Sequence, residues 1–240
     1  MSGRDETDAV RERYARRAAG DRRYHPLQPS VWQSRQELER ATLAMLARQG
    51  WHDLGGRRLL EVGCGSGAHL MDWLRWGCPP AQLRGLELLP ERHAQARALL
   101  PAAVDLWLGD ALQAPVEAAS QDLVMQYTVF SSLLDDGFQQ ALARRMWQWV
   151  RPGGAVLWYD FTYDNPSNPD VRGVPVRRLR ALFPEANITL RRVTLAPPLA
   201  RAVCRLHPTL YTLLNGLPPL RTHVLGWLVK PGPAAADNSA

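Results

Sequence analysis

Residues 58–70, RLLEVGCGSGAHL, decide the fold. An apolar run ends at Glu61, three glycines follow at alternate positions, and an apolar segment that can form a helix begins at once. Such a loop lets backbone N–H groups approach a ligand at the N-terminus of a helix. The spacing also satisfies the relaxed dinucleotide pattern G-x-G-x-x-G/A through Gly63, Gly65 and Ala68, so the loop alone does not choose between cofactors.

Short apolar runs alternate with helical patterns from Arg58 onward, which is typical of βαβ units and a parallel sheet. The pattern predicts an α/β fold with a doubly wound, mostly parallel, seven-stranded sheet and helices on both faces. The expected strands lie near 58–62, 83–87, 104–108, 122–127, 154–160, 188–195 and 223–229. The expected helices between them lie near 67–77, 91–99, 137–149 and 176–183.

Three regions are expected along the chain. Residues 1–50 contain two helical patterns, near 5–18 and from Ser30 onward, and are interpreted as an N-terminal helical lid. Residues 51–230 form the domain with the glycine loop, interrupted by an insertion at 196–222 in which prolines flank a short apolar helix. Residues 231–240 lack periodicity and are expected to be a disordered tail.

Composition narrows the class of protein. A chain of 240 residues with 46% hydrophobic content can bury one sizeable core. No apolar stretch approaches the roughly 18 residues of a spanning helix. The three cysteines are odd in number and form no C-x-x-C pair, which favours neither a disulfide framework nor a metal site. A cytoplasmic protein without a metal is expected.

The positive charge is concentrated in one segment. The formal net charge is +6, and eight arginines stand against the single acid Glu185 between Arg172 and Arg205, at positions 172, 177, 178, 180, 191, 192, 201 and 205. Such a patch suits a phosphate, a carboxylate or an anionic membrane surface. Ordinary solvated helix and strand faces explain it equally well.

Three acids at strand ends bear on which cofactor the glycine loop binds. The negative charge of Glu61 would be unfavourable beside a pyrophosphate. It suits a positively charged amino acid, such as the methionyl part of S-adenosylmethionine. Glu87 ends the second strand, where an acid accepts hydrogen bonds from ribose hydroxyls of either cofactor. Asp110, after the third strand, is placed to reach the exocyclic amine of an adenine.

With these residues the chain resembles the class I S-adenosylmethionine-dependent methyltransferases. The resemblance rests on EVGCGSG (61–67), Glu87, GDA (109–111) and VRPGGAVLWYD (150–160). It implies the strand order 3-2-1-4-5-7-6 with the last strand antiparallel, S-adenosylmethionine as cofactor and S-adenosylhomocysteine as product. The expected cofactor-binding residues are Glu61, Gly63, Gly65, Gly67, Glu87, Asp110, Ala111 and Gln126.

The fourth strand bears on the methyl acceptor. Enzymes that resemble this fold and methylate nucleic-acid bases carry Asp/Asn-Pro-Pro-aromatic or Pro-Cys at the end of the fourth strand. This chain has DLVMQYTVF at 122–130 instead. Nucleic acid is therefore an unlikely acceptor. The interpretation is a small molecule or a cell-surface glycan or lipid precursor, with some anionic character, methylated on oxygen. A peripheral membrane contact is compatible with it, and the sequence leaves the oligomeric state open.

Ligands of open α/β sheets bind beyond the carboxyl ends of the strands, where Tyr159 and Asp160 close the fifth strand. An antiparallel seventh strand begins at the same edge with His223. The hypothesis is that His223 is the general base, that Asp160 orients it beside Tyr159, and that Arg172 or Arg221 holds an anionic group of the acceptor. The alternative is that Asp160 caps a turn and His223 is an ordinary strand residue.

Two other functions remain open from the sequence. One is an NAD-dependent oxidoreductase, allowed by Gly63, Gly65 and Ala68 but opposed by Glu61, Gly67 and Asp110. The other is a non-catalytic module that keeps the cofactor pocket and uses the basic patch to bind RNA or a membrane.

Overall fold

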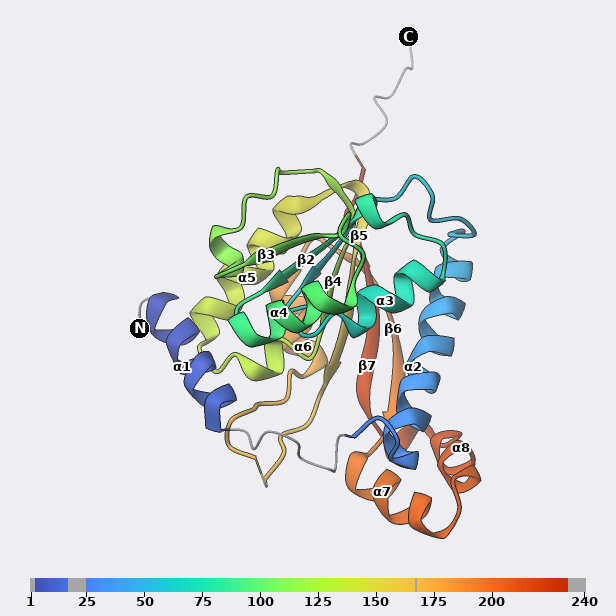
Figure 1. The fold of residues 1–240 in the computed structure, drawn as a ribbon. Coiled ribbons are helices and arrows are strands. Elements are labelled where there is room, and N and C mark those ends of the chain that lie inside the picture. The colour runs from blue at the N-terminus through green and yellow to red at the C-terminus, as the bar shows by residue number, and fades with distance from the viewer. Residues whose placement is uncertain (1–2, 17–24, 167, 233–240) are drawn as a thin grey trace.

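A seven-stranded sheet forms the centre of the computed structural model, which describes residues 3–16, 25–166 and 168–232 (Figure 1). The order is β3-β2-β1-β4-β5-β7-β6, as expected. β7 pairs antiparallel with both β5 and β6, and the other pairings are parallel. The strands are β1 (Leu59–Val62), β2 (Leu83–Glu87), β3 (Asp105–Leu108), β4 (Gln121–Tyr127), β5 (Val150–Phe161), β6 (Asn187–Leu195) and β7 (Arg221–Val229).

Helices cover both faces of this sheet. Apolar side chains of α2, α3 and α4 pack on one face, and those of α1, α5 and α6 pack on the other. The α-helices are α1 (Gly3–Arg16), α2 (Pro29–Arg48), α3 (Ala68–Arg75), α4 (Pro90–Leu99), α5 (Asp136–Trp149), α6 (Val176–Leu182), α7 (Pro197–Leu206) and α8 (Thr209–Asn215). Short 3-10 turns are η2 (Pro80–Gln82), η3 (Ala111–Gln113), η4 (Phe130–Ser132) and η5 (Pro218–Leu220).

Local chemistry sets the helix starts. The Asp135 side chain accepts a hydrogen bond from the N–H of Phe138 at 2.6 Å and so caps α5. Pro90 and Pro197 lie in the first turns of α4 and α7, where a missing N–H costs no helical hydrogen bond. Alternation along the central strands then divides the core, so that Leu157 faces α2 and α3 while Trp158 faces α5 and α6.

The expected elements are confirmed with two differences. β5 begins at Val150 instead of 154, because Val150 already pairs with Gln121. The insertion at 196–222 contains two helices rather than one, since α7 ends before Pro208 and α8 begins after it. A proline cannot continue the hydrogen-bond ladder of a preceding helix. The tail from 233 to 240 lies outside the described residues.

Candidate functional site

The glycine loop joins β1 to α3, and all three glycines have left-handed backbones. Their φ angles are +66° at Gly63, +57° at Gly65 and +86° at Gly67. A Cβ on Gly63 would lie 2.6 Å from Cγ2 of Val129, whereas a Cβ on Gly65 would meet nothing closer than 3.7 Å, at the Arg92 guanidinium. Gly63 is therefore required by packing, while Gly65 borders open space that a ligand can use.

Glu61 lies just before this loop with one unpaired oxygen. Its side chain is buried, and among the residues that the structure describes Oε2 has no hydrogen-bond partner. Burial raises the pKa of Glu61 well above its ordinary value, and the nearby Glu87 and Asp72 raise it further. A buried acceptor without a donor is costly, so the site suits a cation such as the ammonium of a methionyl group.

The other two strand-end acids support backbone turns. Glu87 accepts hydrogen bonds from the N–H groups of Gly65 at 2.7 Å and Leu89 at 2.8 Å, which ties the end of β2 to the glycine loop. Asp110 accepts from the N–H of Leu112 at 2.9 Å and caps η3, which Ala111 begins. Asp110 and Ala111 are half-buried at the β3 end, where the sequence predicts the adenine side of the pocket.

Gln126 differs from the expectation. Its side chain is fully buried, Nε2 donates to the carbonyl of Tyr159 at 3.3 Å, and Oε1 accepts from the N–H of Val129 at 2.9 Å. Both ends of the amide are thus occupied by backbone. The structure assigns Gln126 to support of the β4 end rather than to a direct contact with the cofactor.

The first helix covers the segment that follows β4. Buried Glu6 accepts from Arg13 and from the N–H of Leu134, each at 2.7 Å, and Arg13 donates to the carbonyl of Ser132 at 3.0 Å. The Tyr14 ring lies 4.5 Å from the Arg92 guanidinium carbon, and Arg92 in turn borders Gly65.

A row of aromatic rings crosses the carboxyl ends of the central strands on the α2 side. His69 of α3 stacks on Tyr127 of β4 with centroids 3.8 Å apart. Tyr127 lies 6.2 Å from Tyr159 of β5, which stacks on His223 of β7 at 5.0 Å. Tyr127, Tyr159 and His223 are each 9% exposed, so the row is a mostly buried aromatic wall, of the kind against which a flat or apolar acceptor would pack.

A buried polar network continues from this row. The Tyr159 hydroxyl lies 2.9 Å from Oγ1 of Thr194, and both the N–H and the hydroxyl of Thr194 donate to Oε2 of Glu37, at 3.0 and 3.3 Å. Thr194 has a φ of +63°, an unfavourable conformation for a β-branched residue that is typically retained at functional sites.

Sequence reasoning missed Glu37 and Thr194. Glu37 lies 157 residues from Thr194 in the chain, in a helix whose one other acid, Glu39, pairs with Arg75 near the surface. Thr194 lies in a strand pattern without any turn residue to indicate a positive φ. Nothing in the local sequence indicates that the two side chains meet.

The expected pair of Asp160 and His223 is wrong. In the β5–β7 register Phe161 is opposite His223 and Asp160 is opposite Val224, and opposite residues share a face of the sheet. Asp160 therefore lies on the α5 side, where it accepts from the N–H groups of Ser131 at 3.1 Å and Phe161 at 3.0 Å. Nδ1 of His223 instead lies 3.1 Å from the Thr222 hydroxyl.

Burial moves the pKa values of these two groups in opposite directions. It raises the pKa of Asp160 to about 7 and lowers the pKa of His223 to about 4. Each shift favours the uncharged form of the side chain. His223 is consequently neutral at physiological pH and a weak base.

The two arginines expected to hold an acceptor anion, Arg172 and Arg221, each bind another group of the protein instead. Arg172 forms an ion pair with Asp136 at the start of α5. Arg221 donates to the carbonyls of Asn215 at 2.7 Å and Arg192 at 3.0 Å, and so fastens the insertion to β6. Neither role is that of a free anion clamp, because each guanidinium is engaged within the protein.

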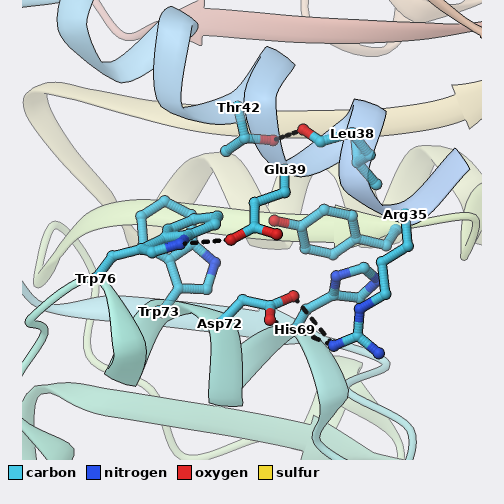
Figure 2. A pocket seen from close by; sticks show the side chains of 9 residues that line it. Arg35, Leu38, Glu39, Thr42, His69, Asp72, Trp73 and Trp76 are labelled. Carbon is cyan, nitrogen blue, oxygen red and sulfur yellow. Dashed lines mark hydrogen bonds and ion pairs between the residues drawn. The ribbon is translucent and has the colours of Figure 1, made fainter. Parts of the chain in front are cut away.

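A narrow pocket lies between α2 and α3 beside the aromatic row. Figure 2 shows Arg35 reaching Asp72 and Trp76 reaching Glu39 across it, and the two contacts measure 3.3 Å each. Burial, followed by the charge of Arg35, lowers the pKa of His69 to about 4. The lining residues are Arg35, Leu38, Glu39, Thr42, His69, Asp72, Trp73, Trp76 and Tyr127.

Two absences concern the described part of the chain. Within residues 3–16, 25–166 and 168–232, no three histidine, cysteine or acidic side chains converge as metal ligands. In the same ranges no helix is both long and apolar enough to cross a bilayer.

The fold and the glycine loop resemble those of the class I S-adenosylmethionine-dependent methyltransferases, and comparison with known proteins agrees with this resemblance. Residues 59–154 match the model of a methyltransferase domain. This match favours S-adenosylmethionine over a dinucleotide as the cofactor, and the dinucleotide interpretation of the glycines is set aside.

The similar proteins act on different compounds. A phthiotriol/phenolphthiotriol dimycocerosates methyltransferase of Mycobacterium ulcerans is 34% identical over 152 residues, which are 60% of this chain and 53% of that protein. The chain thus spans about half the length of this curated relative.

A solved 1,6-didemethyltoxoflavin-N1-methyltransferase of Burkholderia thailandensis, with its acceptor and S-adenosylhomocysteine bound, has a TM-score of 0.63 at 16% identity. The match covers 96% of this chain and 91% of that one. The cyclase SpnF has a TM-score of 0.58 at 16% identity, with 82% and 83% covered. At such identities the likeness shows the fold alone, so the acceptor is argued from the site.

Proposed function

We propose that this methyltransferase transfers a methyl group to a hydroxyl of a small molecule or lipid precursor that carries a planar or apolar part. The observation that carries the proposal is the junction of the aromatic row with the polar network, at Tyr159. The ring stacks on His223, while the hydroxyl enters the chain through Thr194 to Glu37. An acceptor lying on the rings would place a hydroxyl group beside a ready hydrogen-bond partner.

Residues of the glycine loop would hold the cofactor at the neighbouring strand ends. Glu61 would pair with its ammonium, Glu87 with its ribose and Asp110 with its adenine, and Gly65 would leave room for its main chain. When bound, S-adenosylmethionine supplies an electrophilic methyl group. The protein's own contribution is then mostly orientation of the acceptor and exclusion of water.

Proton removal from the acceptor is assigned to the Tyr159 side of the site. Tyr159, Thr194 and Glu37 form a continuous path of hydrogen bonds from the strand edge to a carboxylate. His223 lines the path as a neutral imidazole. Asp160 has no part in it, because it faces the other side of the sheet.

The basic patch gives less support to a non-catalytic binding module. Arg172 and Arg178 both lie within 4 Å of the Asp136 carboxylate, and Arg178 also donates to Gln139. The remaining arginines are divided among α6, β6 and α7. RNA binding without methyl transfer would nevertheless show as strong salt-dependent binding in the absence of turnover.

The test has two stages. Calorimetric titration with S-adenosylhomocysteine, with NAD as the control ligand, should show binding of the first alone. Methyl transfer is then followed by mass spectrometry on matched acceptors that differ only in carrying a hydroxyl or an amine, among phenols, glycolipids and phosphorylated sugars. Methylation of amines alone would overturn the proposed acceptor atom.

A matched tyrosine pair examines the role of Tyr159. Tyr159→Phe should lower kcat by at least about tenfold while the affinity for S-adenosylhomocysteine stays within about twofold. Tyr163→Phe removes a hydroxyl from a tyrosine that is 52% exposed and should leave both quantities unchanged. Equal turnover in the two variants would remove Tyr159 from the mechanism.

A further inference from the structure

The insertion between β6 and β7 forms a lobe beyond the edge of the sheet. Figure 1 shows α7 and α8 projecting from the main body next to the first turns of α2. α2 packs against both helices, and Gln33 donates to the carbonyl of Pro208 at 3.2 Å. We call residues 25–36 and 197–220 together the α7–α8 lobe.

The outer surface of this lobe is unusually apolar. Ala200 and Cys204 of α7 and Tyr211 and Asn215 of α8 point inward at helical spacing, and all four are buried. Apolar side chains also point outward into solvent, with exposed fractions of 82% for Leu27, 80% for Leu206, 68% for Leu213 and 53% for Leu217. Leu206, Leu213 and Leu217 lie close together in the chain, and exposed apolar side chains gathered on one lobe are typical of an interaction surface.

The charge of the lobe has one sign. Residues 25–36 and 197–220 contain no aspartate or glutamate, but they contain Arg35, Arg201 and Arg205. Within the described part of the chain, neither Arg201 nor Arg205 has an ion-pair partner. Arg205 directly precedes the exposed Leu206, so charge and apolar surface lie together.

We propose that the α7–α8 lobe docks on the surface of an anionic lipid bilayer. Leucines entering the interface would remove apolar surface from water, and the arginines would lie at the level of the lipid phosphates. The absence of acids from the lobe matches this partner, because any carboxylate there would be repelled by the same surface.

The position of the lobe would bring the bilayer close to the proposed acceptor side of the site. It leaves the sheet at Leu195 and returns at Arg221, so it borders the strand edge that carries Thr194 and His223. A bilayer bound there would face the acceptor side of the site. The docking itself is independent of which atom is methylated.

Vesicle co-sedimentation of the full chain tests the proposal. Wild-type protein should sediment with vesicles of equal parts phosphatidylglycerol and phosphatidylcholine, and much less with phosphatidylcholine alone. The triple variant Leu206→Ser/Leu213→Ser/Leu217→Ser should lower the partition coefficient by more than about tenfold. Leu99→Ser/Leu108→Ser, which removes leucines that are 50% and 43% exposed near the opposite edge of the sheet, should not lower it.

The arginines have their own matched control. Arg201→Gln/Arg205→Gln should weaken binding to the anionic vesicles by about tenfold, whereas Arg177→Gln/Arg180→Gln on α6 should have little effect. Thermal melting of each variant by circular dichroism confirms that the fold is intact.

Several outcomes would overturn the proposal. Wild-type protein that stays in the supernatant of anionic vesicles does so directly. Equal loss in the lobe and control variants shows that general charge or stability, and not the lobe, governs sedimentation. Concentration-dependent dimerisation that the leucine variant abolishes, without any vesicle binding, would assign the lobe to a second copy of the chain.

Discussion

The ring of His223 stacks on Tyr159 with centroids 5.0 Å apart and planes 15° from parallel, while Asp160, the next residue of β5, lies on the other face of the sheet. Alternation along a strand makes this unavoidable, since consecutive side chains point to opposite faces. The partner of the His223 ring is thus an aromatic phenol and not a carboxylate. In the function that we propose, the acceptor side of the site is built from rings and one hydrogen-bonded chain.

The pH dependence of the free energy of unfolding should differ in sign between Asp160 and His223, which lie on opposite faces of the sheet. Because the folded-state pKa of Asp160 is raised to about 7, the native protein binds more protons than the unfolded chain between pH ~4 and ~7. Stability from this residue falls as pH rises through that window, by about 4 kcal/mol at most. Measured by urea unfolding, the stability of Asp160→Asn relative to wild type should increase as pH rises.

His223 should show the opposite slope and so serves as the control. Its folded-state pKa is lowered to about 4, so the native protein binds fewer protons than the unfolded chain between pH ~4 and ~6.5. Stability from this residue is lost as pH falls through that window. The relative stability of His223→Gln should therefore increase on acidification, and slopes of one sign in both variants would contradict the burial of these groups.

Glu61 should control cofactor affinity. Replacing it with Gln removes the charge opposite the methionyl ammonium and should weaken S-adenosylhomocysteine binding by about tenfold to a hundredfold. The raised pKa of Glu61 means that wild-type affinity should also fall on acidification, because the protonated carboxyl attracts no cation. Glu117→Gln, at an exposed position, is the matched control, and an affinity equal to wild type in Glu61→Gln would exclude the ion pair.

Gly65 should be needed for binding more than for folding. Gly65→Ala places a methyl group into open space at a φ of +57°, so it should cost about 1 kcal/mol of stability and most of the cofactor affinity. Gly50→Ala has the same backbone strain at +71°, with nothing within 4 Å of the added Cβ. Calorimetry should find cofactor binding in the second variant only.

Glu37 should stabilise the fold through Thr194. Glu37→Ala removes the acceptor of a buried backbone N–H and should cost about 1–3 kcal/mol, a fall in Tm of roughly 2–4 °C per kcal/mol for a chain of this size. Glu39→Ala, two residues further along α2 and so on a different face of the helix, removes a more exposed ion pair to Arg75 and should cost under about 1 kcal/mol. Comparable losses in both would mean that the Thr194 network contributes little.

Some of the site followed directly from short stretches of sequence. The glycines of residues 63–67 and the acids at 61, 87 and 110 lie at or just after the end of a strand, and parallel strands end at one edge of a sheet. The order of local patterns therefore predicted the topology, which the structure confirms, and the edge for the cofactor, which stays a prediction.

The sequence by itself determined the elements, the parallel sheet and the glycine loop between β1 and α3, because these depend on residues a few positions apart. Only the tertiary structure decided which side chains meet. The β5–β7 register separated Asp160 from His223, and the packing of α2 on β6 brought Glu37 to Thr194. Such contacts depend on register and helix placement, where a shift of one residue moves a side chain to the opposite face.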